Sequence, residues 1–184
     1  MNTKLIKYKN FIIVIFITLF VFIGISYTLH VEIKSSIDRL KVNIQDSEVH
    51  NVRIFAQNIE KEILKYTQKD IYKILKNDKT LKSNLDNLLS ILVSDKYKYL
   101  FVSTKDKEDD FRYLLDGTQV SEDRAYFDEK IFLDNPKWKH TYEDNVENTI
   151  IQNDLGTLWI TYLYPIVIEG ETKAVVVIDF SQER

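Results

Sequence analysis

The feature that most constrains this chain is an uncharged apolar run near its N-terminus. Residues Phe11–Leu29 read FIIVIFITLFVFIGISYTL, in which 15 of 19 positions are apolar. As a helix that rises about 1.5 Å per residue, this run spans roughly 28 Å, close to the thickness of a bilayer's hydrocarbon core. Three lysines and no acid precede the run, so the positive-inside rule places residues 1–10 in the cytoplasm and residues 30–184 outside it. The sequence therefore predicts a single-pass membrane anchor.

A cleaved signal peptide is the alternative interpretation of this run. Signal peptides have a shorter apolar region, of about 7–15 residues, followed by small residues at the cleavage site. Here the run is longer, and Tyr27–His30 are mostly large residues. An uncleaved anchor is favoured.

The distribution of charge separates the chain's parts. The net charge is −3, yet residues 30–184 hold 22 basic and 28 acidic side chains, a net of −6. An acidic domain repels phosphate backbones, so we expect no nucleic-acid partner. The chain contains no Cys, which excludes disulfides, thiolate nucleophiles and sulfur-based zinc sites.

A long helix is expected directly after the anchor, because residues 30–77 contain neither Gly nor Pro. Apolar residues recur at heptad-like spacing, first at Ile33, Ile37, Leu40 and Ile44, and again, after a phase slip, at Val52, Phe55, Ile59, Ile63 and Tyr66. We expect this helix to break near Asn77–Lys79. It either pairs with a second copy as a dimerising stalk or covers the sheet of its own domain. Both alternatives apply if the start of the helix pairs with a second copy and its end packs on the sheet.

The rest of the chain predicts an α+β domain. Thr80–Val93 has an amphipathic helical pattern that Asp78 or Thr80 caps, and Thr118–Asp154 suggests short helices and loops. Strands are expected at Tyr97–Val102, Phe111–Leu115, Leu158–Ile168 and Lys173–Phe180, the last central in the sheet. The expected fold is an antiparallel sheet of about five strands with helices on one face. The domains are a tip (1–10), an anchor (11–29), a stalk helix (30–77) and a PAS-like domain (78–184).

This order of elements resembles the Cache family, PAS-like extracytoplasmic sensor modules of bacterial membrane receptors. The resemblance rests on YKYLFVSTKDKEDDFRYLLDGT (Tyr97–Thr118) and LWITYLYPIVIEGETKAVVVIDFS (Leu158–Ser181). It implies an inner-membrane receptor in which a small molecule alters helix packing. That packing would control a cytoplasmic output domain such as a histidine kinase, a diguanylate cyclase or a methyl-accepting domain. The chain stops at Arg184 before any such domain, so a fragment of a larger receptor is expected.

The family pocket would lie between the sheet and the irregular stretch. Asp123–Phe127 (DRAYF) is similar to the element by which some relatives hold a carboxylate, although its usual tryptophan is missing. A carboxylate or amino-acid ligand is therefore considered, because an arginine fork binds carboxylates and aromatic rings exclude water. The alternative is a surface ion pair for Arg124 and a core position for Tyr126. The candidate ligand-binding residues are Arg112, Arg124, Tyr126, Trp138, Tyr142, Asp154, Trp159, Tyr162 and Tyr164.

Catalysis is not expected from this chain. Its serines lack nucleophile-elbow glycines, no glycine-rich phosphate loop occurs, and the acids of Asp106–Asp110 lack calcium-loop spacing. His140 with Glu143 and Asp144 is a common surface combination, so neither a metal nor a cofactor is expected. The rival to the sensor hypothesis is a membrane-anchored structural or assembly protein of the pilin type. Pilin-like chains place an acid early in their apolar helix, and Phe11–Leu29 holds none.

Overall fold

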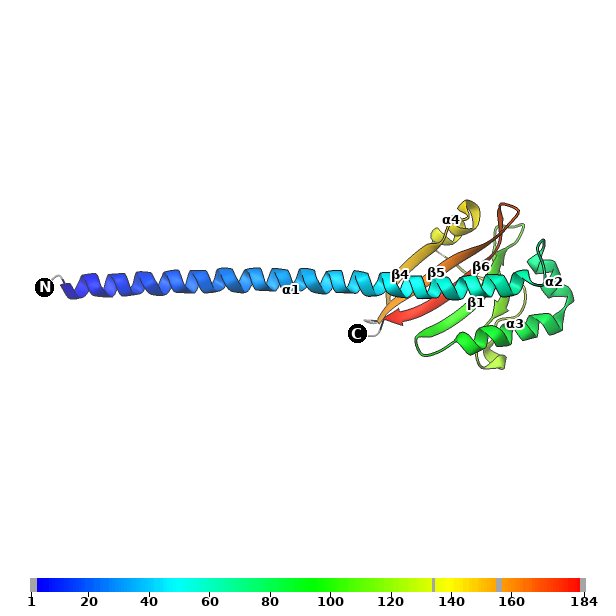
Figure 1. Ribbon diagram of the computed structural model, residues 1–184, viewed down its shortest axis with the longest axis horizontal. Helices are drawn as coiled ribbons and strands as arrows, with labels where there is room; N and C mark the ends of the chain where they lie inside the picture. The colour runs from blue at the N-terminus through cyan, green and yellow to red at the C-terminus, as the bar shows by residue number, and fades with distance from the viewer. Residues whose placement is uncertain (1–2, 134, 155–156, 183–184) are drawn as a thin grey trace. The chain divides into compact units, whose positions relative to one another are not determined.

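A computed structural model describes residues 3–133, 135–154 and 157–182 of the 184-residue chain. Within these ranges, the side chains of residues 3–18, 37–46, 121, 153, 154, 157, 158 and 182 are not described. The chain divides into two compact units, Met1–Glu48 and Val49–Arg184. Each unit is treated by itself below (Figure 1).

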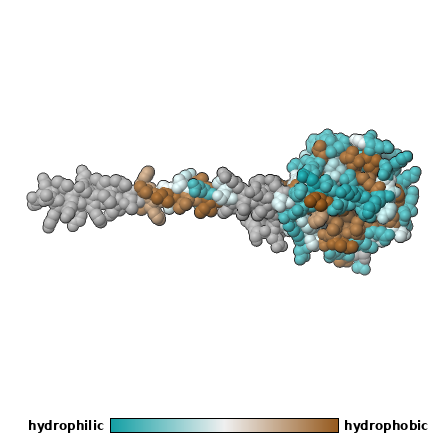
Figure 2. Space-filling view, viewed as in Figure 1, coloured by the Kyte–Doolittle hydropathy of each residue, from teal (hydrophilic) through white to brown (hydrophobic). Residues whose placement is uncertain are grey.

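The first unit is the N-terminal part of α1, which runs from Thr3 to Leu64. Its described side chains from Leu19 to Ile33 include ten exposed large apolar residues, seen as a mainly brown stretch in Figure 2. Residues 11–18 of the predicted anchor lie outside the described side chains. Over the described residues, no helix combines the length and apolar character needed to cross a bilayer.

The second unit is built on a six-stranded antiparallel sheet with strand order β3-β2-β1-β6-β5-β4. The strands are β1 (Tyr97–Lys105), β2 (Phe111–Asp116), β3 (Lys130–Ile131), β4 (Asn148–Asp154), β5 (Thr157–Ile168) and β6 (Glu171–Gln182). β6 lies between β1 and β5, which confirms the central position expected from its apolar run. Glu169 and Gly170 both have positive φ, as a two-residue type I′ hairpin turn requires, and join β5 to β6.

One face of the sheet is covered by the C-terminal part of α1, by α2 (Ile71–Asn77) and by α3 (Lys79–Leu92). The apolar side chains of this face form one core. The helices contribute Val52, Ala56, Ile59, Ile63, Ile71, Leu75, Leu81, Leu85 and Leu89, and the strands contribute Leu100, Val102, Tyr162, Ile166, Val176 and Phe180 among others. The end of the long helix therefore packs on the sheet of its own domain, which is one of the two alternatives that the sequence left open.

The opposite face carries α4 (Lys137–Asp144) and the segment that leads into it. Trp138 and Phe111 centre a second, smaller core with Ile150, Leu163, Val175 and Val177. Helices thus lie on both faces, whereas the sequence interpretation placed them on one. The sequence of β6 explains this. Its side chains alternate between the two faces of the sheet, and apolar residues occur at both odd and even positions, so both faces need a cover.

The expected single helix over residues 30–77 is wrong, because α1 ends at Leu64 and α2 begins at Ile71. The Thr67 hydroxyl accepts hydrogen bonds from the backbone amides of Lys69 (3.2 Å) and Asp70 (3.3 Å). Asp70 then caps α2 by accepting from the Lys73 amide at 2.9 Å. Such side-chain bonds give the backbone an alternative to helix, so the break needs no Gly or Pro. The predicted second helix is confirmed as α3, with Asp78 as its cap.

Candidate functional site

A cavity of about 680 Å³ lies on the α4 side of the sheet. Its floor comes from β1, β2, β4, β5 and β6, the segment that follows β2 covers it, and Trp138 of α4 is also in its lining. This is where the resemblance places a ligand pocket, and the volume falls within the range of small-molecule sites. The lining residues are Tyr99, Phe101, Tyr113, Asp116, Thr118, Glu122, Asp123, Arg124, Ala125, Tyr126, Glu129, Leu133, Trp138, Ile150, Gln152, Thr161 and Asp179.

Asp179 is the most unusual group in the cavity floor. It stands on the central strand β6, opposite Thr161 of β5, and one of its carboxylate oxygens shares a hydrogen bond with Thr161. The other oxygen, Oδ1, is buried and has no hydrogen-bond partner among the described residues. Burial raises the pKa of Asp179 to about 6, and the bond with Thr161 offsets only part of this effect. A buried acceptor without a partner is costly, which makes this oxygen a natural contact for a ligand donor.

The charge of the lining is strongly negative. Five acids line the cavity, against one base, Arg124. The lining acids are Asp116, Glu122, Asp123, Glu129 and Asp179. Their field reaches Tyr113, whose pKa is raised by burial and then by the charges of Asp116, Glu129 and Asp179. A cation would be attracted into this space and an anion repelled.

Aromatic rings complete the walls. Phe101 lies with its ring centroid 4.9 Å from that of Tyr113 and stacks on Trp138 at 6.2 Å. Tyr126 is 79% exposed at the cover. Aromatic faces bind cations favourably, especially where a carboxylate is close.

Three of the nine predicted ligand residues line the cavity: Arg124, Tyr126 and Trp138. The simpler alternative for Tyr126, a core position, is wrong, because this side chain is exposed. Arg124 donates from Nε to the Thr118 carbonyl at 2.6 Å and from Nη1 to Asn87 Oδ1 at 3.0 Å. Among the described residues, it forms no ion pair with a carboxylate.

The other predicted residues do not line the cavity. Arg112 pairs with Asp106 at 2.7 Å, and Tyr142 packs edge-on against Phe111. The Trp159 ring lies beneath the Lys98 ammonium, 5.7 Å from its centroid. The side chain of Asp154 lies outside the described residues.

Tyr162 and Tyr164 face the opposite side of the sheet and contact α1. The Tyr162 hydroxyl donates to Glu147, which also accepts from Arg53 Nε at 2.8 Å, and the Tyr164 hydroxyl donates to Glu60 at 2.8 Å. Burial would raise the pKa of Glu147, but the bonds from Arg53 and Tyr162 outweigh it and hold the pKa low. Burial, aided by Glu60, raises the pKa of Tyr164 to about 12. These groups attach α1 to β5.

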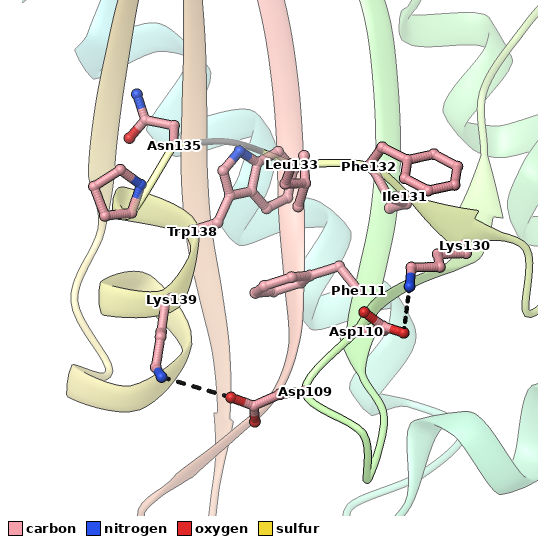
Figure 3. A pocket seen from close by; sticks show the side chains of 11 residues that line it. Asp109, Asp110, Phe111, Lys130, Ile131, Phe132, Leu133, Asn135, Trp138 and Lys139 are labelled. Carbon is pink, nitrogen blue, oxygen red and sulfur yellow. Dashed lines mark hydrogen bonds and ion pairs between the residues drawn. The ribbon is translucent and has the colours of Figure 1, made fainter.

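A second hollow of about 390 Å³ lies beside the first and shares Leu133 and Trp138 with it. In Figure 3, the rings of Phe111 and Trp138 lie next to each other in this hollow, with centroids 5.5 Å apart. Two ion pairs border it, Lys130–Asp110 at 2.6 Å and Lys139–Asp109 at 3.5 Å. The two lysines that line this hollow are balanced by the two aspartates, so its lining carries no net charge that would favour a charged ligand.

His140 contacts Asp144 at 3.2 Å on the surface of α4. Within the part of the chain that the structure describes, no group of three or more His, Asp or Glu side chains converges in a way that could hold a metal ion.

No protein-family model matches the chain, and no curated protein matches it. Among solved structures, the periplasmic domain of RsbU from Chlamydia trachomatis is similar to it, with 13% sequence identity and a TM-score of 0.38. The match covers 53% of this chain and 35% of that chain. Cache membership therefore stays a prediction from the sequence.

Proposed function

We propose that residues 49–184 form a Cache-type sensor domain whose cavity binds a small organic cation with N–H groups, such as a primary amine. The observation that carries the proposal is Asp179, a half-buried side chain at the floor of a 680 Å³ cavity, whose buried Oδ1 has no hydrogen-bond partner among the described residues. An ammonium group placed there would supply the missing hydrogen bond and neutralise the buried charge.

The surrounding charges favour a cation over the carboxylate suggested by the DRAYF segment. A carboxylate would enter beside five acids, and two donors of Arg124 already bond Thr118 and Asn87. An amino acid remains compatible if its ammonium group reaches Asp179. The aromatic rings of Phe101, Tyr113 and Trp138 would then surround the cationic end.

The receptor context of the proposal comes from the sequence. The apolar run Phe11–Leu29 would anchor the chain in a bacterial inner membrane, with residues 30–184 outside the cytoplasm. The heptad-like seam after it would pair two copies into a homodimer. Ligand binding would change the packing of α1 and thereby control an output domain in the cytoplasm.

The experiment is calorimetric titration of the full 184-residue chain with putrescine, tetramethylammonium and succinate. We expect putrescine to bind, tetramethylammonium to bind more weakly because it has no N–H to donate to Asp179, and succinate not to bind. Asp179→Asn should weaken putrescine binding by roughly 10- to 100-fold, because a buried charged hydrogen bond is lost. The matched control is Glu108→Gln, which neutralises an exposed acid outside the cavity lining. Succinate binding that survives Asp179→Asn would contradict the proposal.

A further inference from the structure

The cover of the cavity is attached to α3, a helix of the opposite face. We define the cover as Gly117–Tyr126, the segment that follows β2. We propose that Arg124 is a positioning residue that clamps this cover to α3 through Asn87, so that the cover and α3 close the cavity as one body. The clamp follows from contacts in the structure, and only its effect on ligand exchange rests on the proposed function.

The root of the cover, Asp116 and Gly117, packs tightly against α3 and β1. The amide of Asp116 donates to the buried carboxylate of Asp86 on α3 at 3.0 Å, and the amide of Gly117 donates to the Leu100 carbonyl at 2.8 Å. A Cβ atom at Gly117 would lie 2.8 Å from the Leu100 oxygen and 2.9 Å from Leu89 Cβ. Only glycine fits at this contact, so the root of the cover is fixed by packing.

The Asp116 carboxylate holds the cover in a closed loop. One oxygen accepts from the amide and hydroxyl of Thr118 at 2.9 and 2.8 Å. The other accepts from the amide of Ala125 at 2.7 Å, which brings the two ends of the loop together. This carboxylate is buried, so its hydrogen bonds are protected from competition with water.

Arg124 links this closed loop to α3. Its Nε donates to the Thr118 carbonyl within the cover, and its Nη1 reaches Asn87 on α3. Gln119 makes a second link by donating to the carbonyl of Val93, the residue that caps α3, at 3.0 Å. The cover therefore touches α3 at its root and along its length. A planar guanidinium suits this role because it presents several donors in a fixed fork.

This arrangement separates a positioning role from direct ligand contact. If Arg124 acts through the cover, then removing its partner Asn87 has the same kind of effect as removing Arg124. If Arg124 binds the ligand, then Asn87 is irrelevant. Asn87 is exposed on α3, so its substitution leaves the core intact. Asn84, also exposed on α3, supplies a matched control.

The first test needs no ligand and measures hydrogen exchange at the Thr118 and Ala125 amides in the full chain. In Asn87→Ala we expect exchange about tenfold faster, the effect of losing one charge-assisted hydrogen bond. Arg124→Ala should accelerate exchange further, because it also loses the bond to Thr118. Asn87→Asp should restore protection by pairing with Arg124, and Asn84→Ala should match the wild type. Wild-type exchange in both Asn87→Ala and Arg124→Ala would overturn the clamp.

The second test measures how fast putrescine leaves the cavity. We expect dissociation about tenfold faster in Asn87→Ala and faster still in Arg124→Ala, with both variants able to bind. Loss of binding in Arg124→Ala, with unchanged exchange and dissociation in Asn87→Ala, would show direct ligand contact and overturn the positioning role. If putrescine does not bind the wild type, the proposed ligand class is wrong, and the exchange result alone decides the clamp.

Discussion

Thr161 and Tyr162 are consecutive residues of β5 whose side chains lie on opposite faces of the sheet. Thr161 bonds Asp179 at the cavity floor, while Tyr162 donates to Glu147 beside α1. A strand alternates its side chains, so one peptide unit separates the proposed ligand site from the attachment of the long helix. A shift of β5 would therefore be felt on both faces, which is the coupling that a sensor requires.

Asp179→Asn should stabilise the unliganded protein, with an effect that depends on pH. The pKa of Asp179 rises from 3.8 to about 6 on folding, so between these values the folded state binds more protons than the unfolded state. As far as Asp179 is concerned, the folded state is therefore most stable below about pH 4, where this group is protonated, and it loses this stability as the pH rises through 6 and Asp179 becomes charged. Urea unfolding should give a gain of about 3 kcal/mol for Asp179→Asn above pH 6.5 and almost none at pH 4. A gain that does not vary with pH would argue against this account.

Putrescine binding should weaken in acid, because a proton and the ligand compete for the same carboxylate. With a pKa of about 6 for free Asp179, the dissociation constant should rise about tenfold for each pH unit below 6. Calorimetric titration from pH 5 to 8 tests this, and Asp179→Asn should show a flat profile over the same range. A wild-type profile as flat as that of the variant would exclude Asp179 as the counter-ion.

The Arg53–Glu147 pair should contribute to the attachment of α1. Arg53 forms a two-point contact with the carboxylate, and both side chains are just over one-third exposed. A double-mutant cycle of Arg53→Ala and Glu147→Gln should give a coupling energy of about 1 kcal/mol at pH 7. Folding lowers the Glu147 pKa from its ordinary 4.5, so this coupling is present above that value and disappears as pH falls below it.

A surface pair serves as the control for this cycle. Lys65 and Glu62 form an i,i+3 contact at the end of α1, with Lys65 largely exposed, and should couple far more weakly. Equal coupling in the two cycles would mean that Arg53 and Glu147 do not hold the helix in place.

Gly117→Ala should destabilise the domain by about 1–3 kcal/mol, because the added methyl group overlaps a backbone oxygen and α3. Urea unfolding at pH 7 measures the change. The comparison is Asn84→Ala, an exposed position on α3 that should leave the stability unchanged. A Gly117→Ala protein as stable as the wild type would show that the root of the cover can shift away from Leu89.

Ile33→Cys should form a disulfide between two copies if the heptad-like seam pairs them. The chain has no native Cys, and Ile33 is 58% exposed within the described helix. Its neighbour Glu32 lies off the seam and provides the matched control, Glu32→Cys. Non-reducing gels of membranes after mild oxidation should show a dimer for Ile33→Cys and much less for Glu32→Cys. Equal cross-linking at both positions would contradict pairing along the seam.

The sequence predicted the regular parts of the fold because their patterns are strong. β1, β2, β5, β6 and α3 lie where alternation and helical period placed them. β4 was missed: it is an edge strand of mostly polar residues, with Ile150 buried and its neighbour Ile151 exposed. The helix break at residues 65–70 was missed because Thr67 and Asp70 act through local hydrogen bonds rather than through turn residues.

The site was predicted only in part for a different reason. Alternation shows that Tyr162 and Tyr164 share a face, but it cannot say which face holds the cavity, and they lie on the side of α1. Asp179 was missed because it sits inside an apolar strand that was interpreted as core. A single acid within KAVVVIDF was the available signal, since a charge buried there needs a partner.

The clamp on the cover has an evolutionary consequence. Three of the acceptors that hold the cover, at Thr118, Val93 and Leu100, are main-chain oxygens, which every sequence possesses, whereas Asn87 and Asp116 accept through their side chains. Substitution at an outward-facing position such as Tyr126 would therefore leave the frame of the cover unaltered. If the cavity binds a ligand as proposed, its specificity can therefore change at such positions while the frame of the cover is kept.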